Sequence, residues 1–129
     1  MFINFSNHPS ALWSDEQLAV AKQYGKIVDM EFPAVSVKMT SEQIVKLAME
    51  QIGIIENCVC AENANMGQTT IMCQGEFSLT YAMIKNIKER YPECKIVCAT
   101  SERRTVEEKV DNCTVKKVIF SFGGFREYL

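Results

Sequence analysis

The most informative part of the chain is residues 69–99, which read TTIMCQGEFSLTYAMIKNIKERYPECKIVCA. Its first five residues are apolar or β-branched and predict a buried strand. From residue 76 to residue 91, apolar side chains recur at helical spacing, with Leu79, Met83 and Ile87 on one face. Pro92 ends that helix, and residues 95–99 predict a second strand. A strand, a helix and a strand in this order predict two parallel strands joined by a right-handed crossover.

The first half of the chain shows the same alternation of strands and helices. Residues 2–5 and residues 26–32 predict two further strands. Each is followed by a Ser or Thr with a Gln three residues later, a pattern typical of a capping box at the start of a helix. The two predicted boxes are Ser14 with Gln17 and Thr40 with Gln43.

Two segments depart from this alternation. Residues 56–68 allow two interpretations, in which residues 58–60 either extend the preceding helix or form a small strand. Residues 105–122 alternate in part between apolar and polar side chains around a polar turn, which predicts a β-hairpin. The expected fold class is therefore α/β, a Rossmann-like three-layer sandwich with a parallel four-stranded core followed by a C-terminal β-hairpin. We expect a single domain over residues 1–129.

The composition is that of an ordinary globular protein, with 47% hydrophobic and 23% charged residues. The N-terminus lacks a basic region followed by an apolar run, so we expect no secretory leader. Most of the six cysteines lie within apolar segments, where they are expected to pack as small core residues in a reducing compartment. No apolar stretch approaches the roughly 20 residues that span a bilayer. We expect a cytoplasmic protein with no membrane partner.

Charge and motifs argue against several classes of function. The formal net charge is −2, and only seven basic residues stand against five acidic ones from Lys95 onward. This excess is too small to hold a long nucleic acid by charge, although a small anionic ligand fits it. The cysteines lack the paired spacing and histidines of a zinc site, and the chain has no nucleophile elbow or P-loop. We expect neither a metal nor a cofactor.

Three predicted loops follow the carboxyl ends of parallel strands, where open α/β sheets bind ligands. They are residues 6–10 after the first strand, residues 74–77 after the third and residues 100–104 after the fourth. All three are polar, and the last is basic. The candidate site therefore lies where these loops meet.

The loop after the first strand contains the only histidine of the chain. Asn7 and Ser10 suit a phosphate, a ribose hydroxyl or a base edge, and they suit a tight turn equally well. His8 is either a proton carrier near neutral pH or a simple turn residue. Trp13 is expected to pack against the domain first, with a dimer contact or adenine stacking as its alternatives.

The other two loops offer groups that recognise anions. Gly75 permits close approach of a ligand to the backbone, beside a helix N-terminus with free amides. Glu76 fits this site, but it fits a purely structural role at the helix dipole equally well. Arg103 and Arg104 suit phosphate recognition, and their alternative is solvent-exposed pairing with nearby glutamates. We favour phosphate contact for these arginines.

This layout resembles the CRISPR-associated Rossmann-fold (CARF) domains, which have a parallel Rossmann core followed by a β-hairpin. CARF domains carry a polar residue at the end of the first strand and a basic, hydroxyl-bearing loop after the fourth. Residues 4–9, NFSNHP, also look like the opening of small stand-alone proteins encoded beside type III CRISPR systems. This chain departs from the pattern by lacking a lysine in the loop after the fourth strand. The residues that match are Asn4, Ser6, Ser101, Arg103, Arg104 and Thr105.

The resemblance implies binding of a cyclic oligoadenylate, a symmetric ring that suits the two-fold axis of a homodimer. With no effector module in the sequence, it implies a ring nuclease that cleaves this messenger by metal-independent 2′-hydroxyl attack. The alternatives are a non-catalytic sensor that regulates a partner protein, and an unrelated nucleotide-binding or structural domain. The implied catalytic residues are Ser6, His8, Arg103 and Arg104. The implied ligand-binding residues are Asn4, Asn7, Ser10, Gln74, Gly75, Glu76, Phe77, Ser101 and Thr105.

Overall fold

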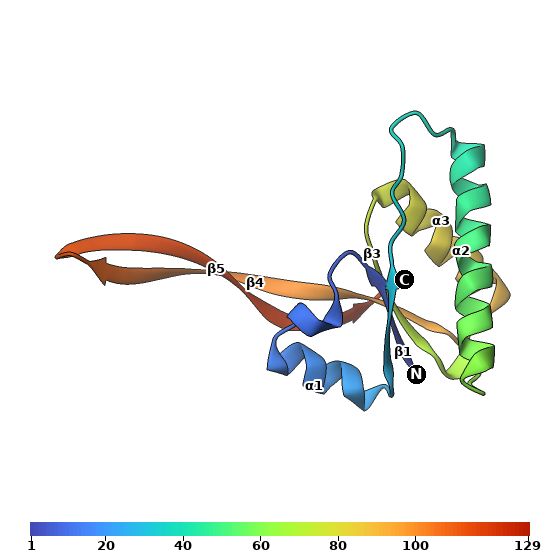
Figure 1. Ribbon diagram of the computed structural model, residues 1–129, viewed down its shortest axis with the longest axis horizontal. Coiled ribbons are helices and arrows are strands. Elements are labelled where there is room, and N and C mark those ends of the chain that lie inside the picture. The colour runs from blue at the N-terminus through green and yellow to red at the C-terminus, as the bar shows by residue number, and fades with distance from the viewer.

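Five strands form one sheet in the order β2-β1-β3-β4-β5 in the computed structural model, which describes residues 1–129 (Figure 1). The first four strands of this order run parallel, and β5 pairs antiparallel with β4. The strands are β1 (Phe2–Ser6), β2 (Ile27–Glu31), β3 (Thr70–Gln74), β4 (Lys95–Val110) and β5 (Cys113–Glu127). The helices are α1 (Asp15–Gln23), α2 (Ser41–Ala61) and α3 (Phe77–Arg90), with short 3-10 turns η1 (Ser10–Leu12) and η2 (Met66–Gln68).

Helices cover both faces of the sheet, so the expected α/β fold with a parallel core and a C-terminal hairpin is confirmed (Figure 1). Alternate side chains of β1 point to opposite faces. Ile3 lies in the larger core, which α2 and α3 cover with residues such as Ile52 and Met83. Phe2 lies in the smaller core on the other face, with Ala21 of α1. No helix is both long enough and apolar enough to cross a membrane.

The helix starts follow the predicted caps, and one ambiguity is resolved. The hydroxyl of Thr40 accepts a hydrogen bond from the Gln43 amide while the Gln43 side chain accepts one from Thr40, so this capping box is complete. At α1 only half of the box forms, with Ser14 accepting from the Gln17 amide. Residues 58–60 extend α2 and form no strand, because Ile55 and Val59 continue its buried face.

The cysteines confirm the core interpretation only in part. All six are free thiols. Cys73 and Cys94 are buried, and burial raises the pKa of the Cys73 thiol to about 12 and that of Cys94 to about 11. Cys60 and Cys113 are exposed, so the prediction that cysteines pack as core residues is wrong for these two.

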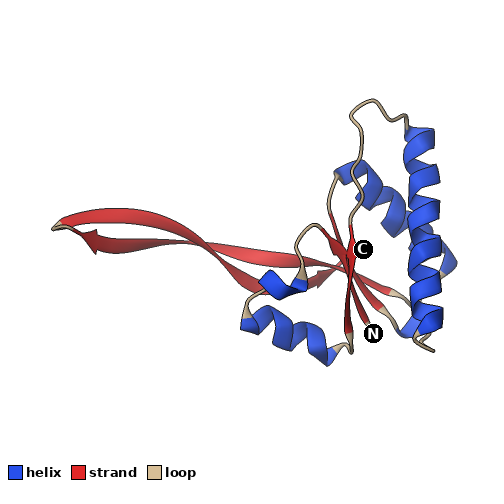
Figure 2. Cartoon of the chain, viewed as in Figure 1, coloured by secondary structure: helices blue, strands red, loops and turns tan.

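The prediction that residues 100–104 form a loop is also wrong. β4 continues through it to Val110 and pairs with β5 along its whole outer length, so both strands leave the domain as a long twisted ribbon (Figure 2). The ribbon closes through a two-residue turn, in which Asp111 and Asn112 have φ of 49° and 64°. Such turns fit the right-handed twist of paired strands. The side chains of residues 101–104 are exposed because nothing covers the ribbon, and the polar sequence that suits this exposure had predicted a loop.

Two glycines give opposite predictions for stability. Gly25, which ends α1, has φ of +128°, and a Cβ there would lie 2.6 Å from the backbone nitrogen of Met1. We expect Gly25→Ala to lower the free energy of unfolding by about 2 kcal/mol or more. Gly53 lies within α2 with no atom near its would-be Cβ, so Gly53→Ala should raise it by about 1 kcal/mol. Urea unfolding followed by circular dichroism measures both, and a shift of the same sign in the two variants would contradict the roles given to these glycines.

Candidate functional site

A cavity of about 560 Å³ lies at the carboxyl ends of β1, β3 and the inner part of β4. The chain passes from β1 to β2 on one side and later to β3 on the other, so strand order reverses here. Open α/β sheets bind their ligands at such a reversal. The residues that line the cavity are His8, Leu12, Trp13, Ser14, Gln17, Met72, Gln74, Ala99, Thr100, Ser101, Phe120, Ser121 and Phe122.

The cavity lies where β3 and β4 part. Their backbone pairing ends at Met72 and Val97, while β4 continues outward. The side chain of Gln74 replaces the next backbone contact, because its Oε1 accepts a hydrogen bond from the Ala99 amide at 2.6 Å. A β-bulge at Thr100 and Ser101 then turns the ribbon away. These features leave a hollow between the end of β3 and the base of the ribbon.

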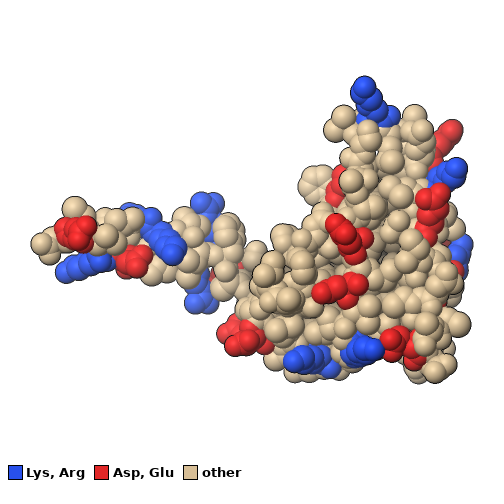
Figure 3. All heavy atoms as spheres, in the orientation of Figure 1, with Lys and Arg blue, Asp and Glu red and all other residues tan.

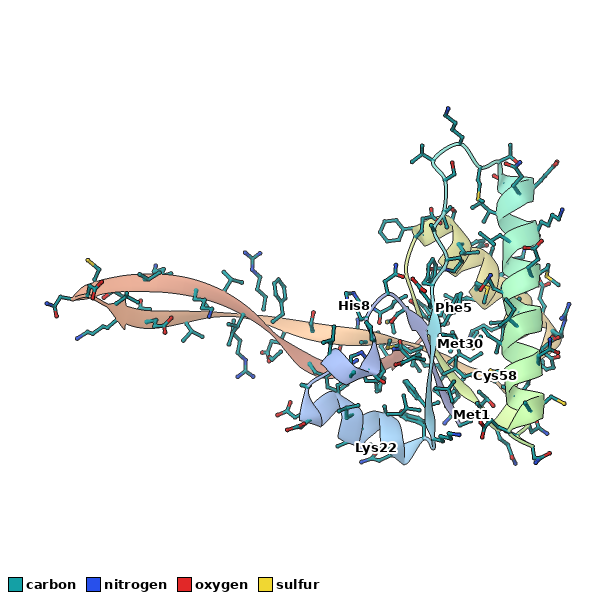
Figure 4. The ribbon with its side chains drawn as sticks, viewed as in Figure 1. Met1, Phe5, His8, Lys22, Met30 and Cys58 are labelled. Carbon is teal, nitrogen blue, oxygen red and sulfur yellow. The ribbon has the colours of Figure 1, made fainter.

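A hydrogen-bond network fixes the loop after β1. Buried Asn4 donates from Nδ2 to the His8 carbonyl oxygen and to Asp29 Oδ1, both at 2.8 Å. Ser6 Oγ donates to Asn4 Oδ1 at 2.6 Å and accepts from the His8 amide. The Asp29 carboxylate also accepts from the Ser10 amide and hydroxyl. This network fixes the loop that contains His8, one of the residues that line the cavity (Figure 4).

Aromatic side chains form another part of the cavity wall. Trp13 donates from Nε1 to the same His8 carbonyl at 3.0 Å and packs on Phe2 and Phe125. Phe122 contacts Phe125 with ring centroids 5.0 Å apart. The expectation that Trp13 packs against the domain is therefore confirmed, and the same side chain also lines the cavity. Phe125 joins the base of the ribbon to the α1 face of the sheet.

The two arginines of the predicted phosphate loop lie on opposite faces of the ribbon. Ser101 pairs with Phe122 and Arg103 with Phe120, so the side chain of Arg103 shares a ribbon face with three cavity residues. Arg103 forms no ion pair. Arg104 faces the other way and donates to Glu102 at 2.9 Å, and this hydrogen bond raises its pKa.

Only part of the predicted site is brought together. The cavity contains His8, Gln74 and Ser101. A separate hollow of about 310 Å³ contains Asn4, Ser6 and Asn7 together with two acidic residues, Asp29 and Glu31. These carboxylates disfavour an anionic ligand there. The residues that line neither hollow are Ser10, Gly75, Glu76, Phe77, Arg103, Arg104 and Thr105.

The residues that follow β3, Gly75 to Phe77, do not line the cavity, and the first two have structural roles. A Cβ at Gly75 would lie 2.6 Å from the ring of Phe32, so glycine makes room for that buried ring. Glu76 caps α3 by accepting from the Leu79 amide and the Ser78 hydroxyl. The Ser78 hydrogen bond contributes most to the lowered pKa of this carboxyl. Phe77 is 91% exposed and lines neither hollow.

Sequence reasoning missed several cavity residues. Phe120, Ser121 and Phe122 enter because the hairpin begins at the sheet, whereas the sequence predicted it to begin at Thr105. Ser14 and Gln17, assigned only to a helix cap, also face the cavity. No three His, Cys, Asp or Glu side chains gather closely enough to hold a metal ion.

A parallel sheet covered by helices on both faces, with a cavity at the reversal of strand order, defines a Rossmann-like α/β domain. The chain belongs to the family described as the uncharacterized protein MJ1673 family, whose model matches residues 1–126. No curated protein and no solved structure matched the chain.

Proposed function

We propose that the protein is a CARF-like domain that binds a cyclic oligoadenylate in this cavity and cleaves the ring. The observation that carries the proposal is the composition of the cavity wall: aromatic rings, hydroxyls and amides, with the unpaired Arg103 on the same ribbon face. These groups match the three parts of a nucleotide, which are a flat base, a ribose with hydroxyls and a phosphate. The resemblance of Asn4–Pro9 to stand-alone CRISPR accessory proteins selects adenylate rings among nucleotides.

Each part of an adenylate finds suitable chemistry in the cavity. Trp13 and Phe122 offer faces on which adenine can stack, an interaction worth about 1–3 kcal/mol per base. Ser101 and Gln17 offer hydrogen-bonding groups for ribose or base edges. The guanidinium of Arg103 fits phosphate oxygens. Phosphate therefore binds at the ribbon side of the cavity, and the base lies toward α1.

The size of the cavity favours a shared ligand. A volume of about 560 Å³ lies within the usual range for small-molecule sites, so it accommodates only part of a ring of four or more nucleotides. A two-fold symmetric ring then requires two copies of the cavity, which a homodimer supplies.

Cleavage proceeds by attack of a ribose 2′-oxygen on the adjacent phosphorus. The bond from phosphorus to the 5′-oxygen breaks as the new one forms, giving a linear product with a 2′,3′-cyclic phosphate and a 5′-hydroxyl. His8 accepts the 2′-hydroxyl proton or supplies a proton to the leaving oxygen. Arg103 stabilises the charge that develops on the phosphoryl oxygens, and Ser101 positions the ribose. Ser6 lies in the loop network and positions His8 through its amide.

One observation favours a second candidate, a sensor that binds the ring without cleaving it and regulates a partner protein. His8 is the only titratable side chain among the residues that line the cavity. General acid–base catalysis with two proton transfers is more effective with two such groups. A site of this composition therefore also suits binding alone.

Incubation of the purified protein with labelled cyclic tetra-adenylate and hexa-adenylate, each with EDTA, separates these functions. We expect linear products that end in a 2′,3′-cyclic phosphate. Tight binding of an intact ring would support the sensor instead. If neither ring is bound or cleaved, the proposal is refuted.

A further inference from the structure

The outer part of the β4–β5 ribbon exposes several large apolar side chains to solvent. It projects from the domain with nothing packed on either face (Figure 1). A two-stranded hairpin alone in water is at best marginally stable. Six of its large apolar side chains are between 38% and 70% exposed, namely Val106, Val110, Val115, Val118, Ile119 and Phe120.

The register divides these side chains between two faces, since paired residues share a face and alternate pairs point oppositely. One face, here called the Phe120 face, contains the cavity residues Ser101, Phe120 and Phe122. Beyond Val118 its outer half becomes polar, with Glu107 paired with Lys116 and Lys109 with Thr114. The opposite face is called the Val106 face and consists of residues 102, 104, 106, 108, 110, 113, 115, 117, 119 and 121.

The Val106 face carries a continuous apolar stripe. Ile119, Val106, Val115 and Val110 follow one another on alternating strands, each at a diagonal position about 7–8 Å from the next. Cys113 continues the stripe opposite Val110. An antiparallel sheet normally covers an apolar face of this kind with another part of the protein. No segment of this chain covers it.

The charges of the ribbon indicate which kind of partner fits the Val106 face. Basic and acidic side chains are mixed along the ribbon (Figure 3). Residues 101–122 include five basic and four acidic residues. This balance fits neither a nucleic acid nor an anionic membrane. On the Val106 face, Arg104 and Lys117 balance Glu102 and Glu108. Across the strands of this face, every charged residue except Glu102 lies opposite an apolar one. A face with zero net charge and this mixed pattern can match its charges with the opposite charges of a second copy, as a two-fold interface requires.

We propose that the Val106 face of the ribbon packs against the same face of a second copy of this chain. The two ribbons then form a small β-sandwich, in which the valine and isoleucine side chains pack together and the four charged residues pair with opposite charges of the second copy. The two Phe120 faces then lie on opposite outer sides of the sandwich, so this interface is distinct from the contact between copies that a shared cyclic ligand requires. This inference concerns the ribbon alone and does not depend on the ligand of the cavity.

Sedimentation of the full chain in reducing buffer tests the interface, because reductant prevents disulfides through the exposed Cys60 and Cys113. We expect a dimer at micromolar concentration and a Val106→Lys variant that dissociates with a dissociation constant about 30-fold higher. Val118→Lys is the matched control, because Val118 is also 42% exposed but lies on the Phe120 face. Circular dichroism checks that both variants remain folded.

A charge exchange tests the same contact independently of packing. Glu108→Lys and Lys117→Glu each leave the Val106 face with a net charge, so each should weaken the dimer. The double variant restores neutrality and should recover much of the affinity. A monomeric wild-type chain at about 100 μM, or equal weakening by Val106→Lys and Val118→Lys, would overturn the proposal.

Discussion

Replacing Arg103 with alanine is expected to slow cleavage of a cyclic oligoadenylate by about 100- to 1,000-fold, the usual effect of removing one group that stabilises transition-state charge. Arg103 shares a ribbon face with Ser101, Phe120 and Phe122 and has no acidic partner. Its guanidinium is therefore free to contact a phosphate at the edge of the cavity. Single-turnover assays at saturating protein measure this step directly.

The neighbouring arginine provides the matched control. Arg104 has the same charge but lies on the other face of the ribbon, bound to Glu102. Arg104→Ala should therefore change the rate by less than about threefold. Arg103→Lys keeps the charge and loses the bidentate geometry, so an intermediate rate is expected. Full activity of Arg103→Ala, or equal losses in both alanine variants, would refute the assignment of Arg103.

The parallel core was predictable because its signals are local. Residues 69–99 show the change from a buried strand to an amphipathic helix and back, and each change has its own side-chain pattern. The α3 face predicted through Leu79, Met83 and Ile87 is the buried one. In such units the crossover follows from chain geometry, so the order of elements determines the parallel arrangement.

The ribbon was harder to predict because strands that face solvent on both sides lose the contrast between apolar and polar positions. Residues 100–104 are mostly polar and charged, and their pairing partners lie about twenty residues further along the chain. Polarity therefore suggested a loop where backbone pairing forms a strand. The two arginines, expected together in one loop, lie on opposite faces for the same reason.

The residues of the cavity wall were only partly predictable from the sequence, because they come from distant segments of the chain. Trp13, Phe122 and Phe125 meet only after α1 and the hairpin pack on the same face of the sheet. The ending FREY, residues 125–128, had no predicted role. In the structure Phe125 centres this cluster, and the Tyr128 hydroxyl donates to the Cys73 carbonyl at 2.9 Å. Such roles depend on tertiary contacts, which periodicity alone does not encode.

Asn4 lies in the middle of β1, and its buried side chain fixes the loop that follows this strand. Asn4→Ala should therefore lower the free energy of unfolding by about 3 kcal/mol. The amide is only 1% exposed and makes three hydrogen bonds at 2.6–2.8 Å. Alanine leaves the Ser6 hydroxyl and one Asp29 oxygen without this partner. The carbonyl of His8 keeps only the bond from Trp13 and a longer contact from Ser6. Thermal unfolding should show a midpoint lower by about 10 °C.

Asn7→Ala is the control for this substitution, since Asn7 lies in the same loop but is exposed and makes no side-chain hydrogen bond. Its stability should stay within about 0.5 kcal/mol of wild type. Because Asn4 holds His8 and Asp29 together, Asn4→Ala should also weaken ligand binding at temperatures where the variant remains folded. A destabilisation below about 1 kcal/mol would mean that the loop after β1 is fixed mainly by the packing of Trp13 on Phe2 and Phe125.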